Sequence, residues 1–112
     1  MKRLDVITRP ENLDKVKRIL AKHEYSGMTV TTAMGAGHQK GSLKEFEILN
    51  VDLNLLPKIN IMIVVLDEDS EDIICELQQG LTTGSVGDGK IFVSDVIDAI
   101  RIRTGERGEK LL

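Results

Sequence analysis

Apolar and polar positions alternate in the first part of the chain in a way that predicts a strand and then a helix. Leu4, Val6 and Ile7 lie among charged residues over positions 2–8, which is typical of a short strand. From Pro10 onward, apolar residues recur at positions 13, 16, 19 and 20, the spacing of one helix face. Proline is tolerated in a first helical turn because its missing N–H has no partner there. We therefore expect a strand at 2–8 and an amphipathic helix from Pro10.

The middle of the chain carries the strongest strand pattern. Threonine and apolar residues at 28–34 favour a second strand. No clear period holds over residues 42–56, so we expect a long functional loop at about 37–56. After Pro57, residues 58–66 are apolar at almost every position, which predicts a central strand covered on both faces.

The last part repeats the order of helix and strand. Three acids at 67–69 favour the start of a helix, and its expected buried residues are Ile73, Ile74, Leu77 and Leu81. A glycine-rich stretch, a strand at 90–93 and an apolar segment, helical or extended, follow. The order β-α-β-β-α-β predicts a single α+β domain of ferredoxin-like fold over residues 1–112. Two helices would cover one face of an antiparallel sheet, which leaves the other face for oligomerisation.

Composition narrows the classes of function. The chain is 41% hydrophobic, enough for one ordinary core, and only 3% aromatic, which leaves few side chains to stack on nucleic-acid bases. A formal net charge of -3 also argues against a nucleic-acid partner. The single Cys75 has no disulfide partner, and we expect it to be a small buried side chain of the second helix. Because no run of about 18 apolar residues occurs, we expect a cytoplasmic protein without direct membrane insertion.

The stretch TTGSVGDGK at 82–90 is the strongest candidate for a ligand site. Glycines allow a tight backbone whose N–H groups point at an anion, and Lys90 adds a positive charge. The spacing is not that of the Walker motif, because Ile91 follows the lysine, and a plain turn is the alternative interpretation. The glycines at 35–41 form a second candidate. No catalytic triad, metal cluster or flanking carboxylate pair is evident, so we expect a binding protein rather than an enzyme.

Four blocks of sequence are specific enough to indicate a family. They read GxGxQKG at 35–41, LPK at 56–58, TGxxGDGKIFV at 83–93 and RIRTGE at 101–106. Together they closely resemble the nitrogen regulatory PII signal-transduction family, in the branch that regulates ammonium transporters, and the similarity covers the whole chain without a gap. The resemblance implies a ferredoxin-like homotrimer with a nucleotide cleft between each pair of neighbouring subunits.

The resemblance also implies roles for the matching residues. The phosphates of ATP or ADP would be held by Gly87, Asp88, Gly89 and Lys90, with Arg101 and Arg103 reaching in from a neighbouring subunit within a segment at 101–109. Adenine and ribose would lie against Ile7, Gly27, Met28, Thr29 and Val64. The phosphate end of the cleft would be lined by Gly35, Gly37 and His38.

A second set of implied roles concerns Mg²⁺ and 2-oxoglutarate. Gln39 would help to hold Mg²⁺ between ATP and that acid, and Lys58 would pair with one of its carboxylates, beside Lys40 and Gly41. Three positions depart from the family pattern. Val51 replaces a tyrosine that accepts a nucleotidyl group, and Tyr25 lies elsewhere, so we expect no uridylylation. His38 replaces an arginine and Met62 a glutamate that could sit near Lys90, which leaves nucleotide binding expected and the 2-oxoglutarate response open.

Two functional hypotheses follow from the resemblance. In the first, bound ATP, ADP and 2-oxoglutarate change the loop at 37–56 and so switch its docking to a membrane transporter or a cytoplasmic nitrogen-metabolism protein. The partner would contact Ser42, Phe46, Ile48, Val51 and Leu53, and a transporter would recruit the protein to the membrane. In the second, the protein senses ATP against ADP alone and regulates another transporter, such as a polyamine transporter. Either way, at most slow incidental ATP hydrolysis is expected.

Overall fold

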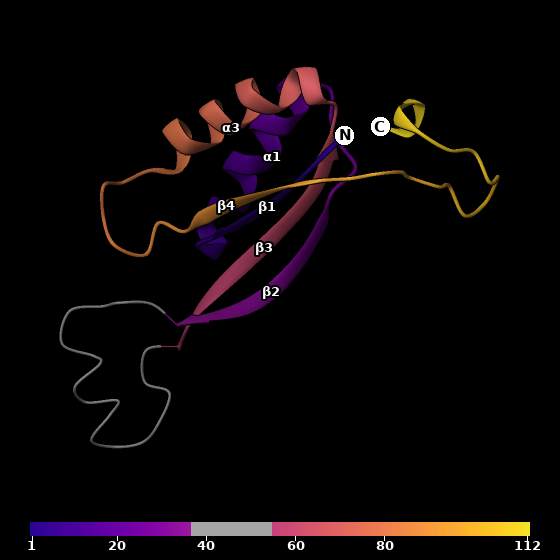
Figure 1. Cartoon of the computed structure of the whole chain (residues 1–112). Coiled ribbons are helices and arrows are strands. Elements are labelled where there is room, and N and C mark those ends of the chain that lie inside the picture. Colours follow the sequence, from indigo (N-terminus) through magenta and orange to yellow (C-terminus); the bar gives the residue numbers. More distant parts are fainter. Residues whose placement is uncertain (37–54) are drawn as a thin grey trace.

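The described part of the chain, residues 1–36 and 55–112 of a computed structural model, forms one antiparallel sheet with two helices on the same face (Figure 1). The elements are β1 (Lys2–Thr8), the 3₁₀ turn η1 (Pro10–Asn12), α1 (Leu13–Lys22), β2 (Thr29–Ala36), β3 (Leu55–Val65), α3 (Asp67–Leu81), β4 (Lys90–Asp95) and the 3₁₀ turn η2 (Glu109–Leu111). The expected α+β, ferredoxin-like order β-α-β-β-α-β is confirmed, and Pro10 opens the first helical segment as expected.

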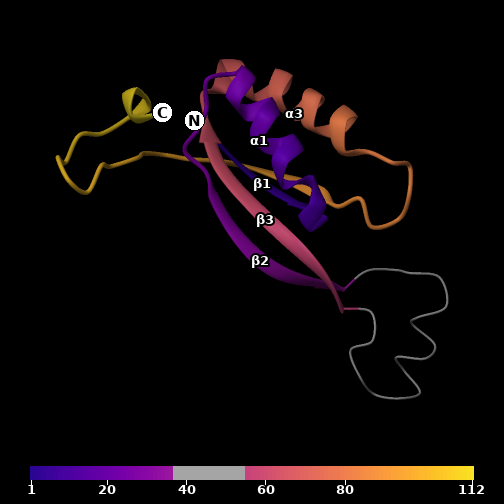
Figure 2. The ribbon, with the colours of Figure 1, turned by 180° about the vertical axis from the view of Figure 1, so that it is seen from behind.

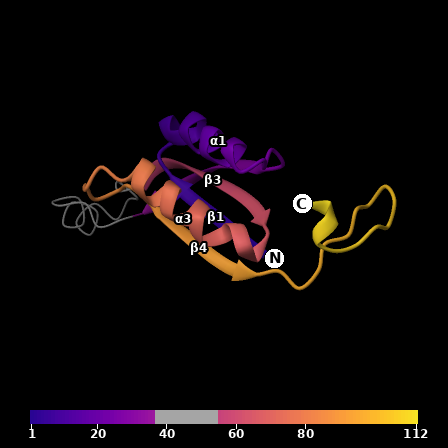
Figure 3. The same cartoon turned by 90° about the horizontal axis from the view of Figure 1, so that it is seen from above.

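The sheet has the strand order β2-β3-β1-β4. Val6 of β1 pairs with Ile61 of β3 on one side and with Ile91 of β4 on the other. Because paired residues of an antiparallel sheet point to the same face, this row and its alternate neighbours face the helices. Figure 3 shows α1 and α3 side by side over that face, and Figure 2 shows both helices above the strands, with no described helix below them.

The core lies between this face and the two helices. The alternation at 59–65 supplies four buried side chains from β3, and the helical spacing of α3 buries Ile73, Leu77 and Leu81 while Ile74 is partly buried. Burial of one large aliphatic side chain stabilises a fold by about 1.5–3 kcal/mol. The core consists of Leu4, Val6, Val16, Leu20, Tyr25, Ile59, Ile61, Ile63, Val65, Ile73, Leu77 and Leu81.

Two expectations about the central strand need correction. The described residues cover its second face only in part, because Asn60, Met62 and Val64 are partly buried. The strand also begins at Leu55, two residues before Pro57, so the expected loop end at residue 56 is too late. Pro57 lies inside β3 opposite Met34, beyond the stretch of β3 that pairs with β1. The β2–β3 hairpin therefore projects past the rest of the sheet (Figure 1).

The expectation that Cys75 is buried is wrong, because this side chain is exposed. The buried positions of α3 are Ser70, Ile73, Leu77 and Leu81. At 100° per residue, a side chain two positions from Ile73 and from Leu77 points away from the sheet. The periodicity of α3 thus outweighs the general tendency of cysteine to be buried.

Tyr25 joins the segment after α1 to the start of α3. Its hydroxyl donates a hydrogen bond to Asp69 Oδ2 at 2.5 Å and accepts one from the backbone N–H of Leu66 at 3.0 Å. Burial, together with the hydrogen bond to Asp69, raises the pKa of Tyr25. The hydroxyl is therefore engaged on both sides within the fold, which gives Tyr25 a structural role.

Residues after β4 form an arm that leaves the sheet and is extended rather than helical up to Ile100 (Figure 1). A bridge between Ile100 and Arg107 closes the arm, and Arg107 pairs with Asp98 at 3.0 Å. Ile97 and Ile102 on this arm are 99% and 100% exposed. Isoleucines exposed to this degree are typical of a surface that another chain covers. No helix in the described ranges is long and apolar enough to cross a membrane.

Candidate anion-binding cleft

The glycine-rich loop at 82–89 connects α3 to β4 and lies directly on the end of β1. Gly87 and Gly89 have φ values of 98° and 108°, a region that side chains other than glycine rarely adopt. A Cβ atom at Gly89 would lie 1.9 Å from the carbonyl oxygen of Ile7. Glycine is therefore required at position 89, both by the backbone angle and by the close approach to β1.

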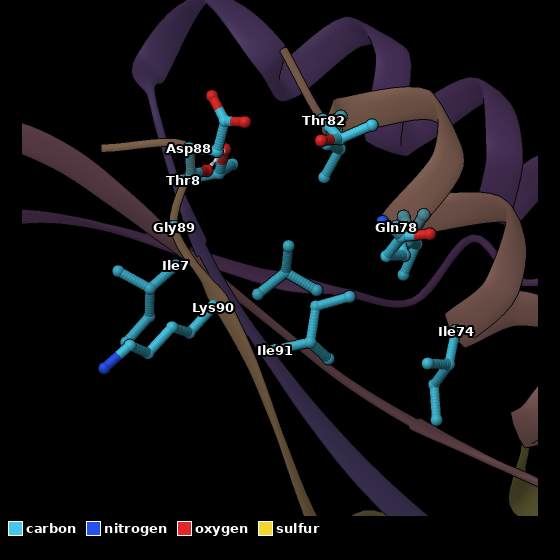
Figure 4. A pocket seen from close by; sticks show the side chains of 12 residues that line it. Ile7, Thr8, Ile74, Gln78, Thr82, Asp88, Gly89, Lys90 and Ile91 are labelled. Atoms are coloured by element: carbon cyan, nitrogen blue, oxygen red, sulfur yellow. Dashed lines mark hydrogen bonds between the residues drawn. The ribbon is translucent and has the colours of Figure 1, made fainter. Parts of the chain in front are cut away.

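Three side chains from other elements hold the carbonyl groups of this loop. The Thr8 hydroxyl donates to the Asp88 carbonyl at 2.9 Å (Figure 4), and Arg9 donates to the Val86 carbonyl at 3.2 Å. Lys58 Nζ of β3 donates to the Gly87 carbonyl at 2.7 Å. With its carbonyls turned toward β1 and β3, the loop has a fixed shape before any ligand binds.

The Asp88 carboxylate closes the loop on itself. It accepts hydrogen bonds from the Thr83 hydroxyl at 2.5 Å, the Thr83 N–H at 2.7 Å and the Gly84 N–H at 3.1 Å, and Arg9 Nη1 lies 2.6 Å away. The bonds from Thr83, followed by that from Arg9, hold the pKa of Asp88 well below its usual range. Figure 4 shows this carboxylate and the Lys90 amine pointing in opposite directions.

A cleft of about 520 Å³, here called the lysine cleft, opens between this loop and the base of the β2–β3 hairpin. Among the described residues, its lining contains two lysines, three glycines and no acidic residue. In the described ranges neither lysine makes an ion pair. A cleft with cationic side chains and glycine backbone suits an anion such as phosphate. The lining residues are Ile7, Gly35, Ala36, Leu56, Lys58, Val86, Gly87, Gly89, Lys90 and Phe92.

The described residues that we expect to contact adenine and ribose do not all line the same cleft. A separate cleft of about 460 Å³, here called the β2 cleft, contains Gly27, Met28, Thr29 and Val64 in its lining. Ile7, expected to join these four, instead lines the lysine cleft. The register explains this separation, because Ile7 pairs with Asn60 near one end of β1 and Val64 pairs with Arg3 near the other. The described residues expected to bind adenine and ribose therefore lie in two separate clefts of one chain.

The C-terminal arginines and Met62 also lie apart from the lysine cleft of the same chain. Arg101 pairs with Glu106 at 2.8 Å within the arm, and Arg103 is exposed. Met62 lines the β2 cleft, so a glutamate at this position would not lie near Lys90 of its own chain. Proximity of position 62 to Lys90 of a neighbouring chain stays a prediction.

Several expected site residues lie outside the described residues, and their roles stay predictions. These are the ligand residues Gly37, His38, Gln39, Lys40 and Gly41 and the partner-contact residues Ser42, Phe46, Ile48, Val51 and Leu53. The Mg²⁺ and 2-oxoglutarate assignments depend on this group. In residues 1–36 and 55–112, no cluster of three or more His, Cys, Asp or Glu side chains is placed to hold a metal ion.

A third cleft, of about 330 Å³, lies between α3 and the strands β1 and β4 (Figure 4). Ile74, Leu77, Leu81 and Ile91 make most of it apolar. Sequence reasoning did not find this cleft, because the same residues are typical of an ordinary buried stripe. It also missed the contact between Arg9 and Asp88, since these residues are 79 positions apart and no motif marks position 9.

The lowered pKa of Asp88 predicts how its contribution to stability depends on pH. In the unfolded chain an aspartate titrates at about pH 3.9. Because the folded-state pKa is lower, the stabilisation is fully present above that value and is lost as pH falls toward the folded pKa. Urea unfolding measures the difference in the free energy of unfolding between the wild type and Asp88→Asn. This difference should be the same at pH 7 and pH 5 and smaller at pH 3. A difference that grows on acidification would contradict the assignment.

The fold and the clefts define a class of protein, a small α+β domain with a glycine-rich loop that is a candidate for anion binding. A family model described as "Nitrogen regulatory protein P-II" matches residues 1–106. A "Nitrogen regulatory protein P-II" of Rhizobium meliloti (strain 1021) is 43% identical over 108 residues, 96% of each chain. A "Nitrogen regulatory protein P-II 2" of Methanothermobacter thermautotrophicus is 44% identical over 110 residues, 98% of this chain and 96% of the relative. The chain belongs to the P-II nitrogen regulatory protein family.

Family membership confirms the resemblance inferred from the sequence blocks. Members of the P-II family are regulatory signalling proteins rather than enzymes, and they act on partners. The geometry adds which residues of this chain are placed to bind a ligand.

Proposed function

We propose that this protein binds ATP and ADP, with their phosphates in the lysine cleft, and that the bound nucleotide controls a partner in nitrogen metabolism or transport. The observation that carries the proposal is the charge of the cleft. Lys58 and Lys90 line the cleft beside the glycine loop, and its described lining holds no acid. The nearby Asp88 carboxylate is turned into the loop. Such a site favours a multiply charged anion over a neutral ligand.

The proposal includes a homotrimer in which each nucleotide lies between two subunits. Two features support an intersubunit site: the lysine cleft and the β2 cleft are separate in one chain, and Arg101 and Arg103 lie on an arm with exposed isoleucines. A neighbouring chain would bring its β2 cleft or its arm to the lysine cleft and bury those isoleucines. Light scattering coupled to size exclusion should give three times the 12.4 kDa chain mass. A monomer would contradict this arrangement.

Isothermal titration with ATP and with ADP tests the proposal directly. Both nucleotides should bind at stoichiometries close to one per chain, because each chain supplies one lysine cleft. Absence of binding at millimolar nucleotide would contradict the proposed function. Added NaCl should weaken binding, since the attraction between phosphate and lysine is screened by salt.

The partner and the role of 2-oxoglutarate distinguish two versions of the proposal. In the first, 2-oxoglutarate binds beside Mg-ATP through Gln39 and Lys58, and the segment between β2 and β3 docks to an ammonium transporter or a cytoplasmic nitrogen-metabolism protein. In the second, favoured by His38 in place of an arginine, the protein compares ATP with ADP alone and regulates another transporter, such as a polyamine transporter. Titration of 2-oxoglutarate in the presence of Mg-ATP separates the two.

The same proposal places the protein in the cytoplasm, from which a transporter would recruit it to the membrane. Affinity capture from cytoplasm and membranes of the source cells, with ATP or ADP added in turn, should retain a partner with one nucleotide and release it with the other. Equal retention with both nucleotides would contradict control by ATP against ADP.

A further inference from the structure

Arg9 lies at the junction between β1 and η1, next to the glycine loop. Its guanidinium contacts the Asp88 carboxylate at 2.6 Å and the Val86 carbonyl at 3.2 Å. A Cβ atom at Gly87 would lie 3.2 Å from Arg9 Nη2 and 3.8 Å from Lys58 Nζ, so both cations lie close to the same side of this glycine. Arg9 and Asp88 are both absent from the lining of the lysine cleft. The pair thus touches the loop without facing the cleft.

The contacts of Asp88 fix the conformation of the glycine loop. Its carboxylate accepts hydrogen bonds from the N–H groups of Thr83 and Gly84, which connects the start of the loop to its end. Arg9, next to β1, donates to the same carboxylate. Arg9 also balances the negative charge of Asp88. Without that balance, a carboxylate free to turn would oppose a phosphate in the neighbouring cleft, because like charges repel most strongly where water is partly excluded.

We propose that Arg9 is a positioning residue for the anion site: acting through Asp88, it fixes the glycine loop and turns the carboxylate away from the lysine cleft. This inference rests on the proposed function, because it concerns how the same site accepts the phosphates of a nucleotide. It adds a residue that none of the sequence blocks contains. It also gives Asp88 the role of an internal anchor, with its side chain engaged in the loop rather than with phosphate.

A double-mutant cycle separates positioning through Asp88 from direct contact with the anion. Arg9→Gln should weaken ATP binding by about 10-fold, because it removes a charge-assisted hydrogen bond that orders the loop. Asp88→Asn should have a similar effect. The double variant should bind no more weakly than either single variant, since both changes break the same contact. If the two factors multiply, Arg9 acts independently of Asp88 and the inference is overturned.

Three further measurements complete the experiment. Arg9→Lys, which keeps the charge, should restore most of the affinity lost in Arg9→Gln. Arg18→Gln on the exposed side of α1 removes the same charge from a residue that lines none of the three clefts, and this variant should bind ATP as the wild type does. In the nucleotide-free protein, the N–H groups of Thr83 and Gly84 should exchange with solvent faster in Arg9→Gln than in the wild type. Unchanged exchange would also overturn the inference.

The outcomes distinguish this inference from the proposed function. A wild-type protein that fails to bind ATP overturns the proposed function and the inference with it. A wild type that binds ATP, with Arg9→Gln binding equally well, overturns the inference alone. If Arg9→Gln does not fold, Thr83→Val removes another donor to the same carboxylate from an exposed position and should weaken ATP binding by a smaller factor, about 3-fold. Unchanged binding by that variant would then count against the inference.

Discussion

Gly89→Ala should abolish measurable nucleotide binding and destabilise the fold. The added Cβ would lie 1.9 Å from the carbonyl oxygen of Ile7 and 3.0 Å from Thr8 Cα, at a φ of 108°. β1 is an inner strand, hydrogen-bonded to β3 and β4, so it cannot move to make room. The loop must lift instead, which breaks its contacts with Thr8 and Arg9. We expect a loss of roughly 2–4 kcal/mol in the free energy of unfolding and at least a 100-fold loss of ATP affinity.

Gly84→Ala is the matched control within the same loop. Gly84 also has a positive φ, 77°, but a Cβ there would meet nothing within 4 Å. This variant should lose about 1–2 kcal/mol from backbone strain alone and keep most of its ATP affinity. Urea unfolding and isothermal titration of both variants measure the difference. Equal effects at the two positions would show that backbone strain, and not the close approach to Ile7, dominates at Gly89.

The fold follows closely from the order of apolar patterns. The alternation at 59–65 and the helical spacing of Ile73, Leu77 and Leu81 identify the side chains that form the core. The second face of β3 could not be judged in the same way. Apolar residues on both faces indicate that something covers them, but the pattern cannot say whether the cover belongs to the same chain. Cys75 shows a similar limit, because residue type predicted burial while helix phase determined exposure.

The candidate site was only partly predictable. Glycines followed by a lysine indicate an anion loop because glycine backbone and positive charge are local properties of the sequence. The contacts of that loop with Arg9 and Lys58 depend on strand register and on residues far away in the chain, and no local pattern encodes them. The separation of Ile7 from Gly27 and Val64 has the same origin, since it follows from how β1 pairs with β3.

Both lysines of the cleft should contribute to phosphate affinity. Lys58→Gln and Lys90→Gln each remove one positive charge while keeping a polar side chain, and each should weaken ATP binding by about 10-fold. Their side chains come from different strands, and only Lys58 contacts the loop, at the Gly87 carbonyl. We therefore expect nearly independent effects and a loss of about 100-fold in the double variant. In the double variant, the affinity for ADP, which has one phosphate fewer, should fall by less than the affinity for ATP.

The control for this prediction is a double variant with the same change in net charge, Lys15→Gln with Lys17→Gln on the exposed side of α1. It should bind ATP within about 2-fold of the wild type, because neither residue lines the lysine cleft and exposed charges are screened by salt. If the control loses as much affinity as the cleft variant, net charge rather than the lysine cleft determines binding. If neither double variant loses affinity, the phosphates bind elsewhere, and the cleft defined by Lys58 and Lys90 is not the nucleotide site.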